Sequence, residues 1–205
     1  MPHADSALVP ESVQTKTEFW THVQLQLEGL YDGQRYWVSN LANASSVIYN
    51  SLLAFPKFFG RTDDKAVNWA GFYLHSSLFP NPLHSSVKDS DEDKHKLLLG
   101  PFCGKPACQF IGVAPGRARG VCAAAFIQRS TVLVKDVESY PGHIACDGDT
   151  KSEIVVPLVL DVPGSVEPVV LGVLDLDCLA VGGFDEEDQA GLEKIAQMIV
   201  QACDW

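Results

Sequence analysis

Long hydrophobic runs and an excess of positive charge are both missing from this sequence. No apolar stretch approaches the roughly 20 residues that cross a bilayer, and the first residues lack the basic start and apolar stretch of a signal peptide. The 15 lysines and arginines are outnumbered by 26 aspartates and glutamates, so the net charge is −11. Because phosphates repel such a chain, we expect no nucleic-acid partner. The missing apolar span and signal peptide predict no membrane partner and a cytoplasmic location.

Cysteine is also sparse. Six cysteines in 205 residues are too few for a disulfide scaffold, and in the cytoplasm they favour metal binding or catalysis. Zinc needs close cysteine pairs that are matched by further Cys or His pairs. Cys103 and Cys108 form the only close cysteine pair, no partner pair follows, and His143 with Cys146 is another near miss. The spacing therefore predicts no metal site and leaves thiol chemistry as the favoured use.

The remaining composition, 46% hydrophobic and 20% charged, is typical of a folded domain. Residues 1–16 are polar and predict a flexible tail, and residues 17–205 predict a single domain. Apolar residues recur at helical spacing in segments 20–30, 37–52 and 184–199. Two interpretations of the stripe in 37–52 stay open, packing within the chain and the interface of a homodimer.

Short apolar segments predict the strands, and the predicted strands are 67–74, 97–101, 109–113, 131–134 and a hairpin of 153–160 with 168–177. Residues 121–128 predict a short helix, 75–96 a long loop and 115–120 a turn. The order of helices, strands, one short helix, strands and a helix indicates the α+β class, with a central antiparallel sheet and helices packed on it.

Alternation along the predicted strands sorts their side chains by face. In the first strand, one face carries Val67, Trp69, Gly71 and Tyr73, and the other carries Phe72 and Leu74. An aromatic wall of Trp69 and Tyr73 suits a methyl or sulfonium-like group, although aromatic residues in strands are commonly plain core. Both interpretations remain open at this point.

Three carboxylates fall on the predicted hairpin. Alternation in Leu174-Asp-Leu-Asp177 puts Asp175 and Asp177 on one face, and Glu153 begins the facing strand. Crowded, partly buried carboxylates raise one another's pKa, so one can stay protonated and act as a general acid, or the cluster can bind an ammonium group. The alternative is a set of solvent-exposed aspartates.

Cys146 lies shortly before Glu153 in a segment without periodicity. Such loops often carry function on a rigid scaffold, and attack by a thiol requires an ionised sulfur. The alternative for any single cysteine is a buried, inert thiol.

Six motifs, in order along residues 17–203, resemble the free methionine-R-sulfoxide reductases, which are enzymes built on a GAF domain. The motifs are Asn68-Trp-Ala-Gly-Phe-Tyr73, Leu99-Gly-Pro-Phe102 with Lys105-Pro-Ala-Cys108, Gly120-Val-Cys122, Gly142-His-Ile-Ala-Cys146-Asp147, Lys151-Ser-Glu-Ile154 and Gly172-Val-Leu-Asp-Leu-Asp177. The long loop 75–96 and the insert 161–167 depart from the family pattern. The resemblance implies a GAF-like fold with the N-terminal helices and the C-terminal helix on one face of the sheet.

The resemblance also implies an oxidoreductase that serves under oxidative stress. The resemblance implies that Cys146 attacks the sulfoxide sulfur, which yields methionine and a sulfenic acid on Cys146. Cys108 is implied as the resolving partner that forms a disulfide, and Cys122 as an auxiliary thiol. A dithiol such as thioredoxin would restore the thiols. No cofactor is implied.

Substrate contacts follow from the same resemblance. It implies that Glu153, Asp175 and Asp177 handle the sulfoxide oxygen and the substrate amine. Trp69 and Tyr73 would enclose the thioether methyl group. Carboxylates that bind an α-ammonium group select the free amino acid, because a peptide-linked residue lacks that group. The alternatives are a non-catalytic GAF module for ligand binding or redox sensing, and a generic peroxide-reducing thiol protein.

Overall fold

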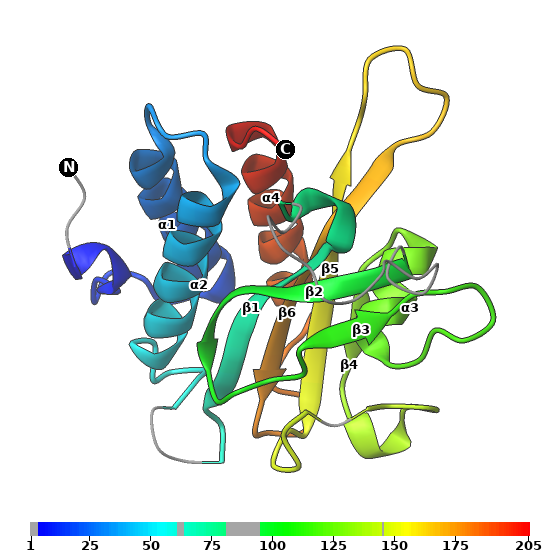
Figure 1. The fold of residues 1–205 in the computed structure, drawn as a ribbon. Coiled ribbons are helices and arrows are strands. Elements are labelled where there is room, and N and C mark those ends of the chain that lie inside the picture. The colour runs from blue at the N-terminus through cyan, green and yellow to red at the C-terminus, as the bar shows by residue number, and fades with distance from the viewer. Residues whose placement is uncertain (1–3, 61–63, 81–94, 145) are drawn as a thin grey trace.

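The computed structural model describes residues 4–60, 64–80, 95–144 and 146–205. Within them, six strands form one antiparallel sheet in the order β3-β2-β1-β6-β5-β4 (Figure 1). The strands are β1 (Val67–His75), β2 (Lys96–Gly104), β3 (Phe110–Gly112), β4 (Val132–Val134), β5 (Ser152–Leu160) and β6 (Val169–Cys178). The α-helices are α1 (Lys16–Tyr31), α2 (Trp37–Leu53), α3 (Val121–Gln128) and α4 (Glu186–Ala202). The α+β prediction is confirmed.

Local sequence explains where α1 and α4 begin. Thr15 caps α1 through a capping box with Glu18, and Asp185 caps α4 through a capping box with Asp188. Figure 1 shows α1, α2 and α4 grouped on one side of the sheet, as predicted. None of the helices in the described part of the chain combines the length and apolarity that a bilayer span requires.

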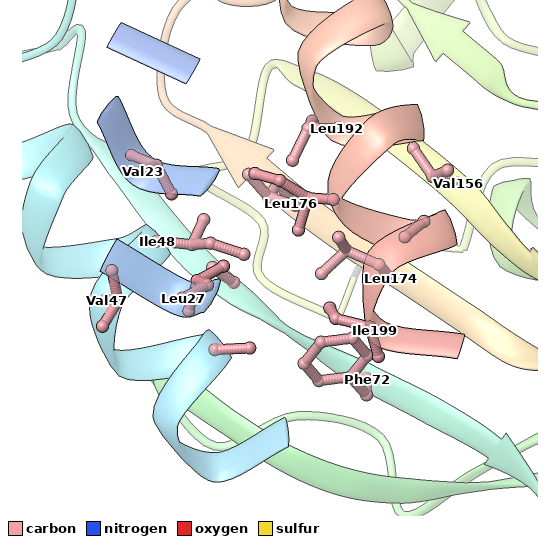
Figure 2. Packing of buried hydrophobic residues seen from close by; sticks show 14 of the residues in the cluster. Val23, Leu27, Val47, Ile48, Phe72, Val156, Leu174, Leu176, Leu192 and Ile199 are labelled. Atoms are coloured by element: carbon pink, nitrogen blue, oxygen red, sulfur yellow. The ribbon is translucent and has the colours of Figure 1, made fainter. Parts of the chain in front are cut away.

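The main hydrophobic core lies between this helical layer and the sheet. Phe72, Leu174 and Leu176 point from the strands toward the helices, where they meet side chains such as Leu27 and Ile48 (Figure 2). All five are fully buried. The apolar stripe in residues 37–52 is therefore packing surface within the chain, and a homodimer stays a prediction.

A second core covers the opposite face of the sheet. Trp69, Tyr73, Val155 and Val173 contribute to it from the strands, and α3 covers them with small side chains such as Ala123. Successive side chains of each central strand therefore point alternately into the helix-side core and into the second core. The three carboxylates of the hairpin, Glu153, Asp175 and Asp177, lie on this second face.

Val67 is placed on the wrong face by simple alternation. It packs in the helix-side core with Phe72, whereas Trp69 lies in the second core. The reason is a register shift between Val67 and Trp69 in the pairing of β1 with β6. A bulge of this kind adds a residue and resets the alternation that follows it.

The predicted turn after residue 101 is also wrong, because β2 continues to Gly104. Its pairing with β1 shifts register between Gly71 and Tyr73, and Pro101 lies in this irregular stretch. A bulge tolerates proline because no ladder hydrogen bond is required there. The predicted loop 75–96 contains the short helix η2 (Ser76–Leu78), and its residues 81–94 lie outside the described part.

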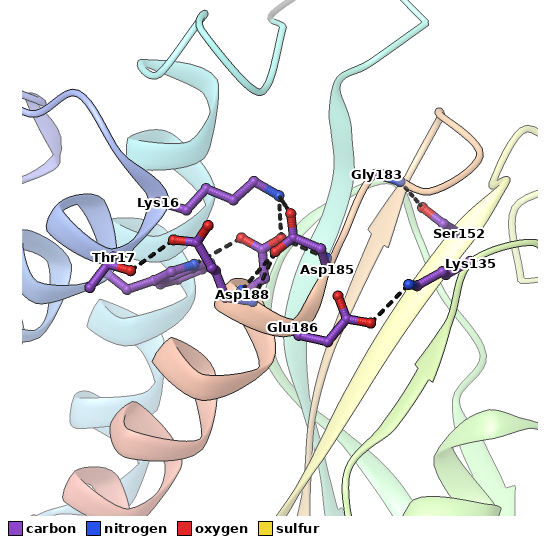
Figure 3. Close-up of polar contacts among 10 residues, drawn as sticks. Lys16, Thr17, Lys135, Ser152, Gly183, Asp185, Glu186 and Asp188 are labelled. Carbon is purple, nitrogen blue, oxygen red and sulfur yellow. Dashed lines mark hydrogen bonds and ion pairs between the residues drawn. The ribbon is translucent and has the colours of Figure 1, made fainter.

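A buried polar cluster fastens α1 to α4. The ammonium group of Lys16 lies 2.9 Å from Asp185 Oδ2 and also pairs with Asp188 (Figure 3). Trp20 Nε1 donates a hydrogen bond to the other oxygen of Asp188 at 2.9 Å. Lys16 is 6% exposed, so the last residue of the predicted tail 1–16 lies inside the folded domain. The flexibility of that tail stays a prediction.

Candidate active site

One pocket, about 240 Å³ in volume, lies on the face of the sheet opposite α1, α2 and α4. The residues that sequence reasoning selected all line it, namely Trp69, Tyr73, Cys108, Cys122, Cys146, Glu153, Asp175 and Asp177. They come from β1, β5, β6, α3 and the loops that follow β2 and precede β5. The structure therefore brings together all the residues selected, and their chemical roles stay predictions.

Strand register places the three carboxylates. Glu153 of β5 lies opposite Asp177 of β6, and Asp177 in turn lies opposite Trp69 of β1. Asp175 lies two residues from Asp177 and therefore on the same face of β6. Glu153 and Asp175 are each 6% exposed. The predicted convergence of the hairpin acids is confirmed.

Burial and mutual repulsion both act on these acids. Burial is the main cause that raises the pKa of Asp175 and Asp177 well above the usual range, and the negative charge of Glu153 adds to it. Burial also raises the pKa of Glu153, against the opposing effect of His143. A desolvated carboxyl group favours its neutral form. The pocket is therefore suited to holding a proton on at least one carboxyl group near neutral pH.

Cys122 is the thiol that contacts the acids. It is the second residue of α3, and its Sγ donates to Asp175 Oδ2 at 3.3 Å and lies 3.9 Å from Glu153 Oε1. Burial raises its pKa well above the usual value, and the charges of Asp175 and Glu153 raise it further. These three side chains could together hold a metal ion, since their ligand atoms all lie within 4.8 Å of one another.

Cys146 lies on the irregular loop before β5, is exposed, and has its thiol against Cys108. Desolvation of the sulfur is the largest of the effects that raise its pKa to about 12, and contact with the Cys108 side chain adds to it. The resting side chain is thus a protonated thiol rather than the thiolate that attack requires. All six cysteines are free thiols.

Contacts that sequence reasoning did not foresee hold these two cysteines. Asp147 follows Cys146, accepts a hydrogen bond from Asn68 Nδ2 at 3.1 Å and pairs with Lys105 at 3.0 Å. The Tyr73 hydroxyl donates to the backbone oxygen of Cys108 at 3.0 Å. Both cysteine segments are therefore fastened to β1. Only the tertiary structure shows these contacts, because the partners are distant in sequence.

His143 also has a contact that its sequence position did not reveal. Its Nε2 lies 3.2 Å from Glu153 Oε2, and its side chain is 14% exposed. Apart from its place three residues before Cys146, no sequence signal pointed to this contact. The imidazole links the cysteine loop to the carboxyl cluster.

Both interpretations of Trp69 and Tyr73 apply, because these residues belong to the second core and also line the pocket as an aromatic wall. The Trp69 ring stacks between Tyr73 and Phe102, with ring centroids 5.8 and 5.5 Å away. Within the described part of the chain, Trp69 Nε1 and Asp175 Oδ1 are buried without a hydrogen-bond partner. Buried polar atoms are normally paired, so such atoms in a pocket indicate where a polar ligand binds.

The chain is similar to several known proteins over nearly its full length. No protein-family model matches the chain. A free methionine-R-sulfoxide reductase of Saccharomyces cerevisiae is 40% identical over 201 residues, covering 98% of this chain and 94% of the relative. A solved GAF-domain structure, 40% identical, covers 100% of this chain and 98% of its own with a TM-score of 0.77. The substrate complex of a free methionine-R-sulfoxide reductase from Neisseria meningitidis is 31% identical, covers 96% and 95%, and has a TM-score of 0.71.

Proposed function

The chain belongs to the free methionine-R-sulfoxide reductases, oxidoreductases of the GAF fold, and from this premise we propose that its pocket reduces free L-methionine-(R)-S-oxide to L-methionine. One observation carries the proposal. Two thiols in contact, Cys108 and Cys146, share a pocket with desolvated carboxyl groups and an aromatic wall. This combination supplies a nucleophile, a proton donor and a surface for a thioether.

In the first step, the Cys146 sulfur attacks the sulfoxide sulfur. A protonated carboxyl group of the cluster gives its proton to the sulfoxide oxygen, and the proton of the Cys146 thiol replaces it. The oxygen then moves from the substrate sulfur to the Cys146 sulfur, so the sulfur–oxygen bond of the substrate and the sulfur–sulfur bond formed by the attack both break. Methionine leaves, and Cys146 carries the oxygen as a sulfenic acid. Sulfur is reduced in the substrate and oxidised in Cys146, so atoms and electrons balance.

In the second step, the Cys108 thiol attacks the sulfenic acid of Cys146. A disulfide forms and water leaves. The contact between these two side chains supports this step, because the resolving thiol needs no large movement. We propose thioredoxin as the dithiol that reduces the disulfide by exchange, and the exposure of Cys146 leaves that bond accessible. The location is then cytoplasmic, where such dithiols keep cysteines reduced.

Cys122 acts as an auxiliary thiol in this mechanism. It is buried, and the surrounding acids disfavour its thiolate form. As a thiol it donates to one oxygen of Asp175, which leaves the unpaired Oδ1 of Asp175 for the substrate. Its place between the acids therefore suits an orienting group better than a nucleophile.

The remaining pocket residues explain substrate choice. Trp69 and Tyr73 offer ring surface to the thioether methyl group. The carboxyl cluster of Glu153, Asp175 and Asp177 binds the α-ammonium group through those members that stay ionised. A peptide-linked methionine sulfoxide lacks this ammonium group and would leave buried charge unpaired.

Coupled turnover tests the proposal. With thioredoxin, thioredoxin reductase and NADPH, we expect racemic free methionine sulfoxide to support NADPH consumption that stops when half of it is used. Consumption to completion would contradict the stereochemistry, and no consumption would favour a non-catalytic sensor. A peroxide-reducing protein would instead use hydrogen peroxide at a rate that Asp175→Asn leaves intact.

Cysteine variants test the assigned steps. Cys146→Ser should abolish methionine release, whereas Cys108→Ser should release about one methionine per protein and then stop. Cys203→Ser is the matched control, because this thiol is buried in the helix-side core, and it should cycle normally. Full multiple turnover by Cys146→Ser would exclude Cys146 as the nucleophile.

A further inference from the structure

The pocket is acidic at its buried end and carries arginine at its exposed end. Arg119 lines the same pocket as the buried Asp175 and is itself exposed. It belongs to the segment 115–120 that the sequence predicted as a plain turn. The structure places that turn in the lining of the pocket, directly before α3.

Arg119 differs from the other Lys and Arg side chains of the pocket, Lys105 and Arg117, which both have partners. Lys105, which also lines the pocket, pairs with Asp147 and Asp149 at 3.0 Å each, and Arg117 is engaged in an interaction of its own. Neither an ion pair nor a hydrogen bond joins Arg119 to the described residues. A positive charge that borders an acidic pocket and has no partner among the described residues is available to a ligand.

The start of α3 adds hydrogen-bond donors beside this arginine. Gly120 is its N-cap, with φ of 84°, and no side chain caps the eight-residue helix. The first backbone N–H groups of a helix lack partners within the helix and favour an anion. Gly120 and Cys122 both line the pocket, so these donors border the same space as Arg119.

The position of Cys122 shows that the start of α3 lies close to the carboxyl cluster. It is the second residue of α3, and its Sγ lies 3.3 Å from Asp175 Oδ2. The start of α3 is therefore within one side-chain length of the carboxyl cluster. Asp175 Oδ1, 6% exposed as a residue, has no partner there, which is an independent sign that the pocket receives a polar ligand.

A free amino acid matches this arrangement, because its ammonium and carboxylate groups share one carbon atom. We propose that Arg119 and the first N–H groups of α3 bind the α-carboxylate of the substrate, while the carboxyl cluster binds its α-ammonium group. The inference rests on the proposed function and extends it. The free amino acid is then selected in two ways, through its α-ammonium group and through its α-carboxylate. A peptide bond or an amide at the carboxyl end removes the second of these groups.

Binding measurements isolate this contact from the reaction. The Cys146→Ser variant is titrated by calorimetry with methionine-R-sulfoxide and with its α-amide, which keeps the ammonium group and the sulfoxide. We expect the amide to bind more weakly. Arg119→Met in the same background should weaken binding of the free amino acid about tenfold, as loss of a hydrogen bond between charged groups does. It should leave binding of the amide unchanged, and Arg119→Lys should restore part of the affinity for the free amino acid.

Arg129→Met is the matched control, because it removes the same charge from an exposed arginine that pairs with Glu167 at 2.9 Å. It should not change the preference for the free amino acid over the amide. If Arg119→Met keeps that preference, or if Arg117→Met removes it instead, the assignment is overturned. Selective weakening by Arg119→Met supports it even if turnover by the unmodified protein fails, and such failure would contradict the proposed reaction.

Discussion

At the scale of single residues, burial decides which side chain holds a proton. Burial and nearby negative charge raise the pKa values of Cys146, Cys122 and Asp175 together. A resting site with protonated thiols and at least one protonated carboxyl group follows. Such a site carries less negative charge than three ionised carboxylates would, and a bound substrate ammonium group would favour the ionised form of these acids.

The protonation of Cys146 predicts how it reacts with iodoacetamide. Only the thiolate is alkylated, so a pKa of about 12 makes the rate rise about tenfold per pH unit from pH 7 to pH 10. Peptide mass spectrometry of Cys146 measures this rate. Free cysteine, with a pKa of about 8.5, is the control and should level off within the range. A plateau for Cys146 below pH 9 would contradict its desolvated state.

Asp175 predicts a stability that falls with pH. Its pKa is raised on folding, so its stabilising effect is complete below the unfolded pKa of about 3.9 and is lost as pH rises through the folded value. The side chain in Asp175→Asn cannot ionise. The free energy of unfolding of this variant, relative to the wild type, should therefore be higher at pH 8 than at pH 4 by at least about 1 kcal/mol. Urea unfolding at both pH values measures the gain.

Asp136→Asn is the control for that measurement. Asp136 is half-buried, and its hydrogen bonds from Ser139 and Glu138 lower its pKa. Asp136 therefore stabilises the fold above its unfolded pKa, and this stabilisation is lost as pH falls. Asp136→Asn should thus show no rise in free energy of unfolding, relative to the wild type, between pH 4 and pH 8. A similar gain in both variants would mean that general charge repulsion, rather than burial of Asp175, governs the effect.

At the scale of elements, one glycine sets the approach of α4 to α1. A Cβ atom at Gly191 would overlap the Trp20 ring of α1, whereas a Cβ at Gly29 would meet open space. Gly191→Ala should therefore destabilise the domain by about 1–3 kcal/mol, because overpacking forces the helices apart. Gly29→Ala is the matched helical control and should stabilise by up to about 1 kcal/mol. Thermal unfolding measures both, and equal shifts would contradict the close approach.

The hairpin of β5 and β6 is the element that builds the acidic end of the site. Its register brings Glu153 opposite Asp177, and the same strands send Ile154 and Leu176 into the helix-side core. Because side chains alternate in both strands, packing of one face fixes the positions of the acids on the other. The register of the active site therefore depends on a hydrophobic core that contains none of its residues.

At the scale of the whole molecule, one sheet carries two cores and should unfold as one unit. Ile154 and Val155 are neighbours on β5, both fully buried, and they belong to the helix-side core and the second core respectively. Ile154→Ala should cost about 2–5 kcal/mol, and Val155→Ala about 2 kcal/mol after allowing for its smaller side chain. Each substitution should lower the midpoint of a single unfolding transition, and far-UV circular dichroism and Trp fluorescence should give the same midpoint. Separate transitions would show that the faces unfold independently.

The sequence by itself determined the elements and the content of the site. Apolar periodicity located α1, α2 and α4, and the β-branched segments located the hairpin, because these signals depend on local spacing alone. Alternation also placed Asp175 and Asp177 on one face. The six ordered motifs indicated the family, and the same residues line the pocket.

Only the tertiary structure decided how those residues meet. It placed Cys122 against Asp175, fastened Asp147 to Asn68, and brought Arg119 into the lining of the pocket. The bulges in β1 and β2 moved Val67 to the other face and carried β2 past Pro101. Such contacts join residues far apart in the chain, and a bulge changes the face of every residue beyond it, so local spacing cannot encode either one.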